Sequence, residues 1–128
     1  MSCAVLTNGN NLSASNTVSI GNTAINWATV TTTAITANQT IAIVPLTGNI
    51  TGVQFLVKGI DSSGAKYSVA TVQAVTNGTS VDYSVFGGVA LTGTTGTLAV
   101  NIVSSNVQLQ VTPASSNSTV WTTQYRTI

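Results

Sequence analysis

The chain has 128 residues, of which 43% are hydrophobic and only 4% are charged, and its formal net charge is +1. The apolar fraction excludes disorder throughout and suffices for one domain with a hydrophobic core. Three basic residues cannot build the cationic surface that phosphate-rich partners need, so nucleic acid and anionic membrane surfaces are excluded as partners.

The sequence shows no signal for export or membrane insertion. No apolar run approaches the roughly 20 residues of a membrane span, and the first residues lack the basic and apolar regions of a signal peptide. The only cysteine is Cys3, so no disulfide within the chain is expected. These features favour synthesis in a reducing cytosol, although the Thr-, Ser- and Asn-rich composition suits a protein that works outside the cell.

Residues 1–24 are rich in Asn, Ser and Thr and are predicted to form an extended N-terminal arm that precedes a folded domain over residues 25–128. Val18 and Ile20 alternate with polar residues as in a pairing strand, so the arm either frays or becomes ordered on a neighbouring subunit.

The first half of the domain alternates apolar and polar residues with period two, which is typical of β-strands. Strands are predicted over residues 25–33, 40–44 and 50–60. Pro45 ends the second of these strands, because proline cannot donate to a strand ladder. Asp61–Gly64 is predicted to be a turn in which Asp61 begins the turn and Gly64 supplies a positive φ angle.

The second half continues the alternation and adds clear turn signals. Asn77-Gly78 predicts a two-residue type I′ hairpin turn, and Gly87-Gly88 ends or bulges the strand that follows it. Gly93 and Gly96 flank a loop, and a further hairpin is expected around Ser104-Ser105. The predicted strands are residues 65–75, 80–86, 97–103, 106–111 and 119–128.

About eight short strands separated by Gly, Asn and Ser turns define the expected fold class. No stretch places apolar residues with helical spacing over two turns. The chain is therefore predicted to be an all-β, antiparallel β-sandwich or jelly-roll-like domain.

The residues needed for common catalytic chemistry are missing. The sequence has no histidine, which removes the most frequent general base. The two carboxylates, Asp61 and Asp82, are better explained by turn capping and by a polar strand face than by a glycosidase pair. No catalytic residue, metal ligand set or cofactor site is predicted, so an enzyme is not expected.

Five aromatic side chains are candidate contacts for a glycan. Their positions alternate within predicted strands, so packing in the core is the favoured alternative to a sugar-stacking platform. These residues are Trp27, Tyr67, Tyr83, Trp121 and Tyr125.

The low number of charged residues also indicates whether the chain forms an oligomer. Natural sheet edges are usually guarded by lysine or proline against pairing with other chains, and this sequence has almost none of these guards. Burial of the edges in a symmetric oligomer would solve the problem, so a homo-oligomer is predicted, most simply a trimer.

Three stretches of the sequence resemble a known group of proteins. They are FLVKGIDSSGAKYSVA at 55–70, VDYSVFG at 81–87 and VQLQVTPASSNSTVW at 107–121. The chain resembles small β-sandwich proteins on the virion surface of tailed bacteriophages, such as the decoration and tail-fibre-like proteins of marine phages and cyanophages. The resemblance covers roughly residues 41–128. It implies a virion component assembled in the host cytoplasm, with the major capsid protein or other virion proteins as partners.

Two functions follow from that resemblance. The first is a capsid decoration protein that stabilises the head. The chain is short, begins with Met and lacks a shaft, which slightly favours this function. The alternative is a tail-fibre or tail-associated component, or a carbohydrate- or receptor-binding module. A pilus-like subunit would need an export signal, which is not visible.

Overall fold

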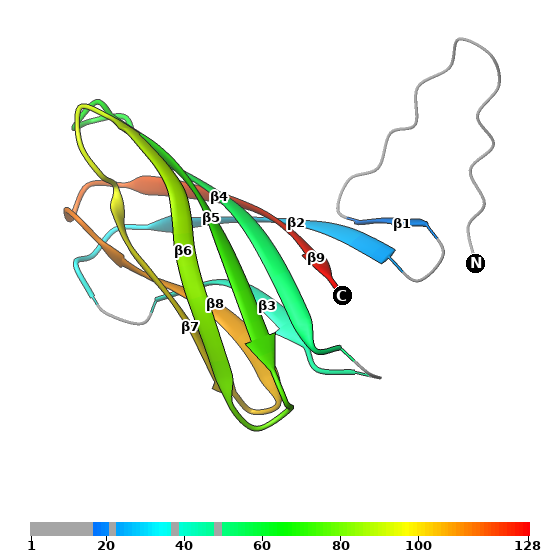
Figure 1. Ribbon diagram of the computed structural model, residues 1–128. Coiled ribbons are helices and arrows are strands. Elements are labelled where there is room, and N and C mark those ends of the chain that lie inside the picture. Colours follow the sequence, from blue (N-terminus) through cyan, green and yellow to red (C-terminus); the bar gives the residue numbers. More distant parts are fainter. Residues whose placement is uncertain (1–16, 21–22, 37–38, 48–49) are drawn as a thin grey trace, which may run out of the picture.

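The computed structural model describes residues 17–20, 23–36, 39–47 and 50–128. These residues form nine antiparallel strands in two sheets and no helix, so the predicted all-β class is confirmed (Figure 1). The strands are β1 (Thr17–Ile20), β2 (Thr23–Thr32), β3 (Gln39–Pro45), β4 (Gly52–Asp61), β5 (Lys66–Thr76), β6 (Val81–Leu91), β7 (Gly96–Val103), β8 (Asn106–Pro113) and β9 (Thr119–Thr127).

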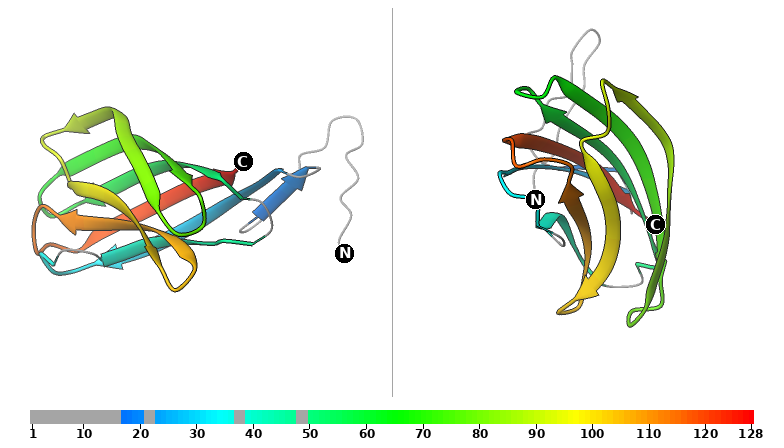
Figure 2. Two further views of the ribbon diagram at one scale, coloured as in Figure 1. Left: turned by 60° about the horizontal axis from the view of Figure 1, so that its bottom comes forward. Right: turned by 90° about the vertical axis from the view of Figure 1, so that its left-hand side faces the viewer.

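The two sheets differ in size and lie face to face (Figure 2). The larger sheet has the order β1-β2-β9-β4-β5-β6, and the smaller has the order β3-β8-β7. Across the interface β3 contacts β2 and β9, while β7 contacts β6. The smaller sheet therefore covers one face of the larger sheet, and the larger sheet keeps β1 and β6 as its edges.

The N-terminal hairpin extends beyond the sandwich (Figure 1). β1 pairs with the start of β2, with Val18 opposite Ile25 and Ile20 opposite Thr23. The predicted pairing strand at Val18 and Ile20 is therefore present, although its partner is β2 of the same chain. Cys3 and most of the predicted arm over residues 1–24 lie outside the described residues, so the arm stays a prediction.

The core forms where the inward faces of the two sheets meet. From the larger sheet, β4 contributes Val53, Phe55 and Val57, each at most 2% exposed. From the smaller sheet, β8 contributes Val107 and Leu109, which are fully buried. Strict alternation puts these residues on one side of each strand, which confirms the predicted sandwich.

Trp121 on β9 is the largest side chain in this core, and its indole fits only because residues on other strands have no side chain there. It is 2% exposed, and its Nε1 donates a hydrogen bond to Thr32 Oγ1 at 3.0 Å. Gly59 faces the indole, and a Cβ on Gly59 would lie 2.7 Å from Trp121 Cζ3. A Cβ on Gly96 would lie 2.6 Å from the Thr112 carbonyl oxygen and 3.1 Å from Trp121 Cη2. Both glycines are therefore required by packing, a role that their positions in the sequence do not reveal.

The turn between β5 and β6 differs from its prediction. Asn77-Gly78 does not form a two-residue type I′ turn, because β5 and β6 pair last at Thr76 and Val81 and leave a four-residue loop. Of the two residues only Gly78 has a positive φ, whereas a type I′ turn needs two. The Asn77 side chain instead accepts hydrogen bonds from the backbone N–H groups of Thr79 and Ser80, which stabilises the wider loop.

The type I′ geometry occurs at the other predicted hairpin. Ser104 and Ser105 connect the paired residues Val103 and Asn106, with φ angles of 49° and 62°. The predicted hairpin around these serines is thus confirmed.

The strand after that loop is longer than predicted. β6 continues to Leu91, and its register with β5 shifts between Val69 and Thr71, opposite Gly87 and Gly88. Of the two predictions for Gly87-Gly88, the bulge is correct and the strand end is wrong. Gly87 has a φ of 64°, a conformation that glycine adopts at little cost in a bulge.

Candidate functional site

The face of the larger sheet that points away from the smaller sheet is uncovered, and we call it the outer face. Along β4 the inward residues alternate with Gln54, Leu56, Lys58 and Ile60, which point to the outer face. Residues directly opposite each other in an antiparallel ladder share a face. The pairing register therefore identifies the outer-face residues of every neighbouring strand.

The five candidate aromatics are divided between the core and the surface. Trp121 is buried, and Tyr125 packs against Phe55 with ring centroids 5.8 Å apart. The Tyr125 hydroxyl donates to the Ile43 carbonyl at 3.2 Å, and desolvation by burial raises the pKa of this phenol. For these two residues the position matches the core-packing alternative.

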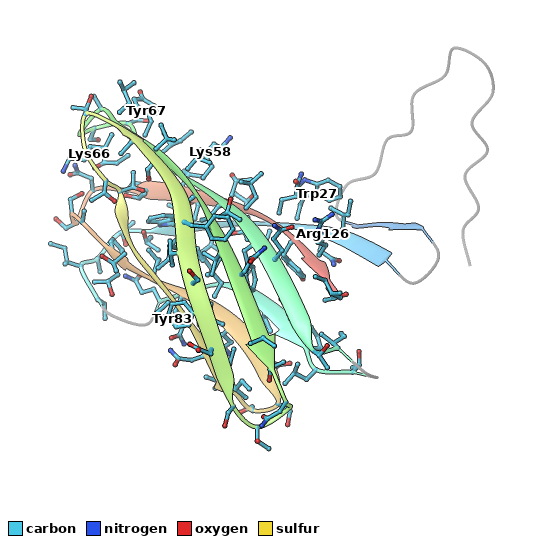
Figure 3. All side chains as sticks on the ribbon, in the orientation of Figure 1. Trp27, Lys58, Lys66, Tyr67, Tyr83 and Arg126 are labelled. Carbon is cyan, nitrogen blue, oxygen red and sulfur yellow. The ribbon has the colours of Figure 1, made fainter. Side chains whose placement is uncertain are left out.

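The other three aromatics are accessible but do not form one platform (Figure 3). Trp27 pairs with Gln124 and Tyr67 pairs with Ile60, so both lie on the outer face, in different cross-strand rows. Tyr83 pairs with the buried Ala74, so it lies on the opposite face of β6, where it is 40% exposed. A glycan contact by any of these residues remains a prediction.

A polar row crosses the outer face near the ends of β9 and β4. In this row Ile25, Arg126, Gln54, Gln73 and Ser84 are successive cross-strand partners on β2, β9, β4, β5 and β6. Arg126 Nε donates to Gln54 Oε1 at 2.9 Å, which orients the guanidinium along the row. Trp27, opposite Gln124, lies on the same face in the neighbouring row (Figure 3). Sequence reasoning missed this row because Gln54 and Arg126 are 72 residues apart.

Two hollows flank the Gln54–Arg126 pair, and we call them together the polar groove. One has a volume of about 460 Å³ and also contains Gln73, Asp82 and Ser84 in its lining. The other, of about 290 Å³, contains Ile25, Leu56 and Gln124. The larger volume lies in the lower part of the range of small-molecule sites in proteins, and the smaller volume lies just below that range.

The far end of the outer face is mainly apolar, with Lys58 beside Val69 as its charged member. Ile60, Tyr67 and Leu91 form one cross-strand row, and Val69 pairs with Val89 in the next row. We call these five residues the apolar patch. Val89 is 71% exposed and Leu91 is 66% exposed, and both lie on the free edge strand β6. Exposed apolar clusters of this kind mark surfaces that contact other molecules.

The two carboxylates do not face a common substrate site. Asp61 pairs with Lys66 at one end of the β4–β5 ladder, whereas Asp82 pairs with Val75 near the opposite end. Within the described part of the chain, no group of three or more His, Cys, Asp or Glu side chains is placed to hold a metal ion.

Asp61 has a structural role in the described domain. It is 1% exposed, and its Oδ1 accepts the Gly64 N–H at 2.9 Å, as predicted for the turn. Its Oδ2 accepts hydrogen bonds from Ser115 Oγ and Asn117 Nδ2, both at 3.1 Å. The positive φ in this turn belongs to Ala65, at 53°, so the prediction that Gly64 supplies it is wrong. Asp61 thereby ties the β4–β5 turn to the loop before β9.

These contacts predict how acid affects the fold. The Gly64 N–H bond, aided by Asn117, Ser115 and Lys66, holds the pKa of Asp61 below its usual value of 3.8. A lowered folded-state pKa contributes stability above the unfolded-state pKa and loses it as the pH falls through the folded value. We therefore expect Asp61→Asn to destabilise the fold at pH 7 and the gap from wild type to narrow below about pH 4. Urea unfolding of both proteins across pH 2–7 measures that gap, and a gap independent of pH would contradict the prediction.

The fold and the site together define a class: an antiparallel β-sandwich with an accessible sheet face that carries a polar groove and an apolar patch. No family model matches the sequence, and no curated protein matches it. Among solved structures the fold is similar to part of the tailspike protein of Acinetobacter phage vB_ApiP_P1, at 18% identity and a TM-score of 0.54. The match covers 97% of this chain and 23% of the tailspike chain.

A second solved structure shows a weaker similarity. The tailspike protein of Acinetobacter baumannii phage AM24 matches 80% of this chain and 26% of its own length, at 12% identity and a TM-score of 0.46. The chain thus spans about a quarter of the length of either tailspike.

Among the described residues, no helical segment has the length and hydropathy of a membrane span.

Proposed function

We propose that this chain is a non-enzymatic, tail-associated component of a bacteriophage virion whose outer face contacts the host surface. The observation that carries the proposal is the fold similarity over 97% of the chain to part of a phage tailspike. This similarity supports a tail-associated component better than a capsid decoration protein, because a tailspike is part of the phage tail. The groove on the outer face is lined by the amide side chains of Gln54, Gln73 and Gln124, which suit contact with a hydroxyl-rich surface.

The location in the particle tests this proposal directly. Antibodies raised against the purified protein, carrying gold particles, should label the tail of the virion in electron micrographs. Label distributed over the head would restore the decoration function. Absence of label from intact and from disrupted particles would contradict both virion functions.

Self-association is the second part of the proposal. β6 is a free edge without lysine or proline, and its exposed apolar residues include Val85, Phe86, Val89 and Leu91. We expect the protein to form a homo-oligomer, most simply a trimer, through the apolar patch.

A lysine at position 89 should weaken this association. Val89→Lys puts a charge into the centre of the apolar patch, where its burial between subunits would carry a desolvation cost. Light scattering after gel filtration should give a trimer for wild type and a smaller species for the variant. Val103→Lys is the control, because Val103 is exposed on β7, outside the patch. A monomeric wild-type protein at micromolar concentration would contradict this expectation.

A further inference from the structure

The guanidinium of Arg126 is oriented for a ligand rather than for an ion pair. Its Nε is held by Gln54 Oε1 at 2.9 Å, and in the described part of the chain its terminal nitrogens have no hydrogen-bond partner. No carboxylate of the described residues forms an ion pair with it; Asp82 lies three strands away in the sheet order β9-β4-β5-β6. An oriented planar guanidinium binds a carboxylate through two parallel hydrogen bonds.

The other polar groups of the groove suit hydroxyl groups. Gln73 and Gln124 are exposed, and their side chains make no hydrogen bond within the described residues. An amide offers two donors and a carbonyl acceptor, which matches a hydroxyl group that both donates and accepts. Asp82 is acceptor-only when ionised, and its Oδ1 already accepts the Tyr83 N–H at 2.9 Å. A ligand at that end must therefore donate, as a hydroxyl does.

The groove also offers apolar surface and sufficient length. Ile25 and Leu56 line the smaller hollow, and the half-buried Trp27 lies on the same face opposite Gln124, which lines that hollow. Such surfaces pack against the C–H faces of a sugar ring. The hollows, of about 460 and 290 Å³, meet at Gln54 and Arg126, so a chain of several sugar units could cross the sheet with its acidic group at the centre.

We propose that the polar groove binds an oligosaccharide that carries a carboxylate, with Arg126 binding the carboxylate and Gln73, Gln124 and Asp82 binding hydroxyl groups. The inference rests on the proposed host-contact function and adds the chemical class of the ligand. A nucleic acid fits less well, because Arg126 is the only basic residue in the lining of the two hollows. Asp82 would also repel a second phosphate.

Calorimetry with defined oligosaccharides tests the inference on the intact chain. The probes are trimers of galacturonate, of mannuronate and of α2,8-linked sialic acid, with the methyl ester of each as its neutral counterpart. We expect at least one acid to bind and its ester to bind at least tenfold more weakly. Arg126→Gln should weaken binding of the acid by at least tenfold. Lys58→Gln removes the same charge from the same face outside the groove lining, so its affinity should stay within twofold of wild type.

Each contrary result has a definite meaning. No binding of any acid, equal binding of acid and ester, or equal loss in the Arg126 and Lys58 variants would overturn the inference. Thermal unfolding of each variant establishes that it is folded. Gold label on the tail together with no binding would remove the ligand assignment and leave the tail function intact, whereas label on the head would remove the tail function alone.

Discussion

Replacing Phe55 with alanine is expected to lower the free energy of unfolding by about 3–5 kcal/mol. The ring is fully buried between the two sheets and contacts Tyr125, so its loss removes apolar burial and leaves a cavity. The measurement is urea unfolding followed by tryptophan fluorescence at neutral pH.

Leu56→Ala is the matched control for this variant. Leu56 is the next residue on β4, points to the outer face and is 47% exposed. We expect a loss of about 1 kcal/mol or less at this position. Equal losses at the two positions would contradict the assignment of the inward and outward faces of β4.

The second large effect is expected at Gly59. An added Cβ would approach Trp121 Cζ3 to 2.7 Å and would also collide with Thr95 Oγ1. The indole is buried and held by its bond to Thr32, so it cannot move away freely. Gly59→Ala should therefore destabilise the fold by about 1–3 kcal/mol through overpacking.

Gly88→Ala separates this packing effect from the general effect of replacing a strand glycine. A Cβ on Gly88 meets no atom within 4 Å, and its φ is not positive, so the substitution should be neutral or slightly stabilising. Urea unfolding measures both variants, and near-ultraviolet circular dichroism reports the environment of Trp121. A spectrum that stays unchanged in Gly59→Ala would contradict the proposed collision.

The prediction of a two-residue turn at Asn77-Gly78 failed because the local preference of these residues conflicts with the register of the sheet. Asn77-Gly78 favours a two-residue turn on local grounds, but the β5–β6 register pairs Thr76 with Val81 and leaves four residues to connect. The Asn77 side chain then satisfies the backbone of that loop. Register depends on the whole ladder, which a local pair of residues cannot encode.

The candidate site also depends on strand pairing that local sequence does not encode. Alternation along each strand places Arg126 and Gln54 on strand faces, but not beside each other. Their contact arises because β9 is inserted between β2 and β4 in the larger sheet. Trp121 is buried because it points toward the smaller sheet, whereas Trp27 pairs with the outward-facing Gln124, although both residues alternate similarly within their strands.

The sequence by itself determined the all-β class, the approximate positions of the strands and the alternation that selects Val53, Phe55 and Val57 for the core, because these depend on period-two hydrophobicity and local turn residues. The tertiary structure alone decided which strands share a sheet, that β6 is a free apolar edge, and that one face remains uncovered. These features depend on contacts between residues far apart in the chain, and the polar groove and the apolar patch exist only through them.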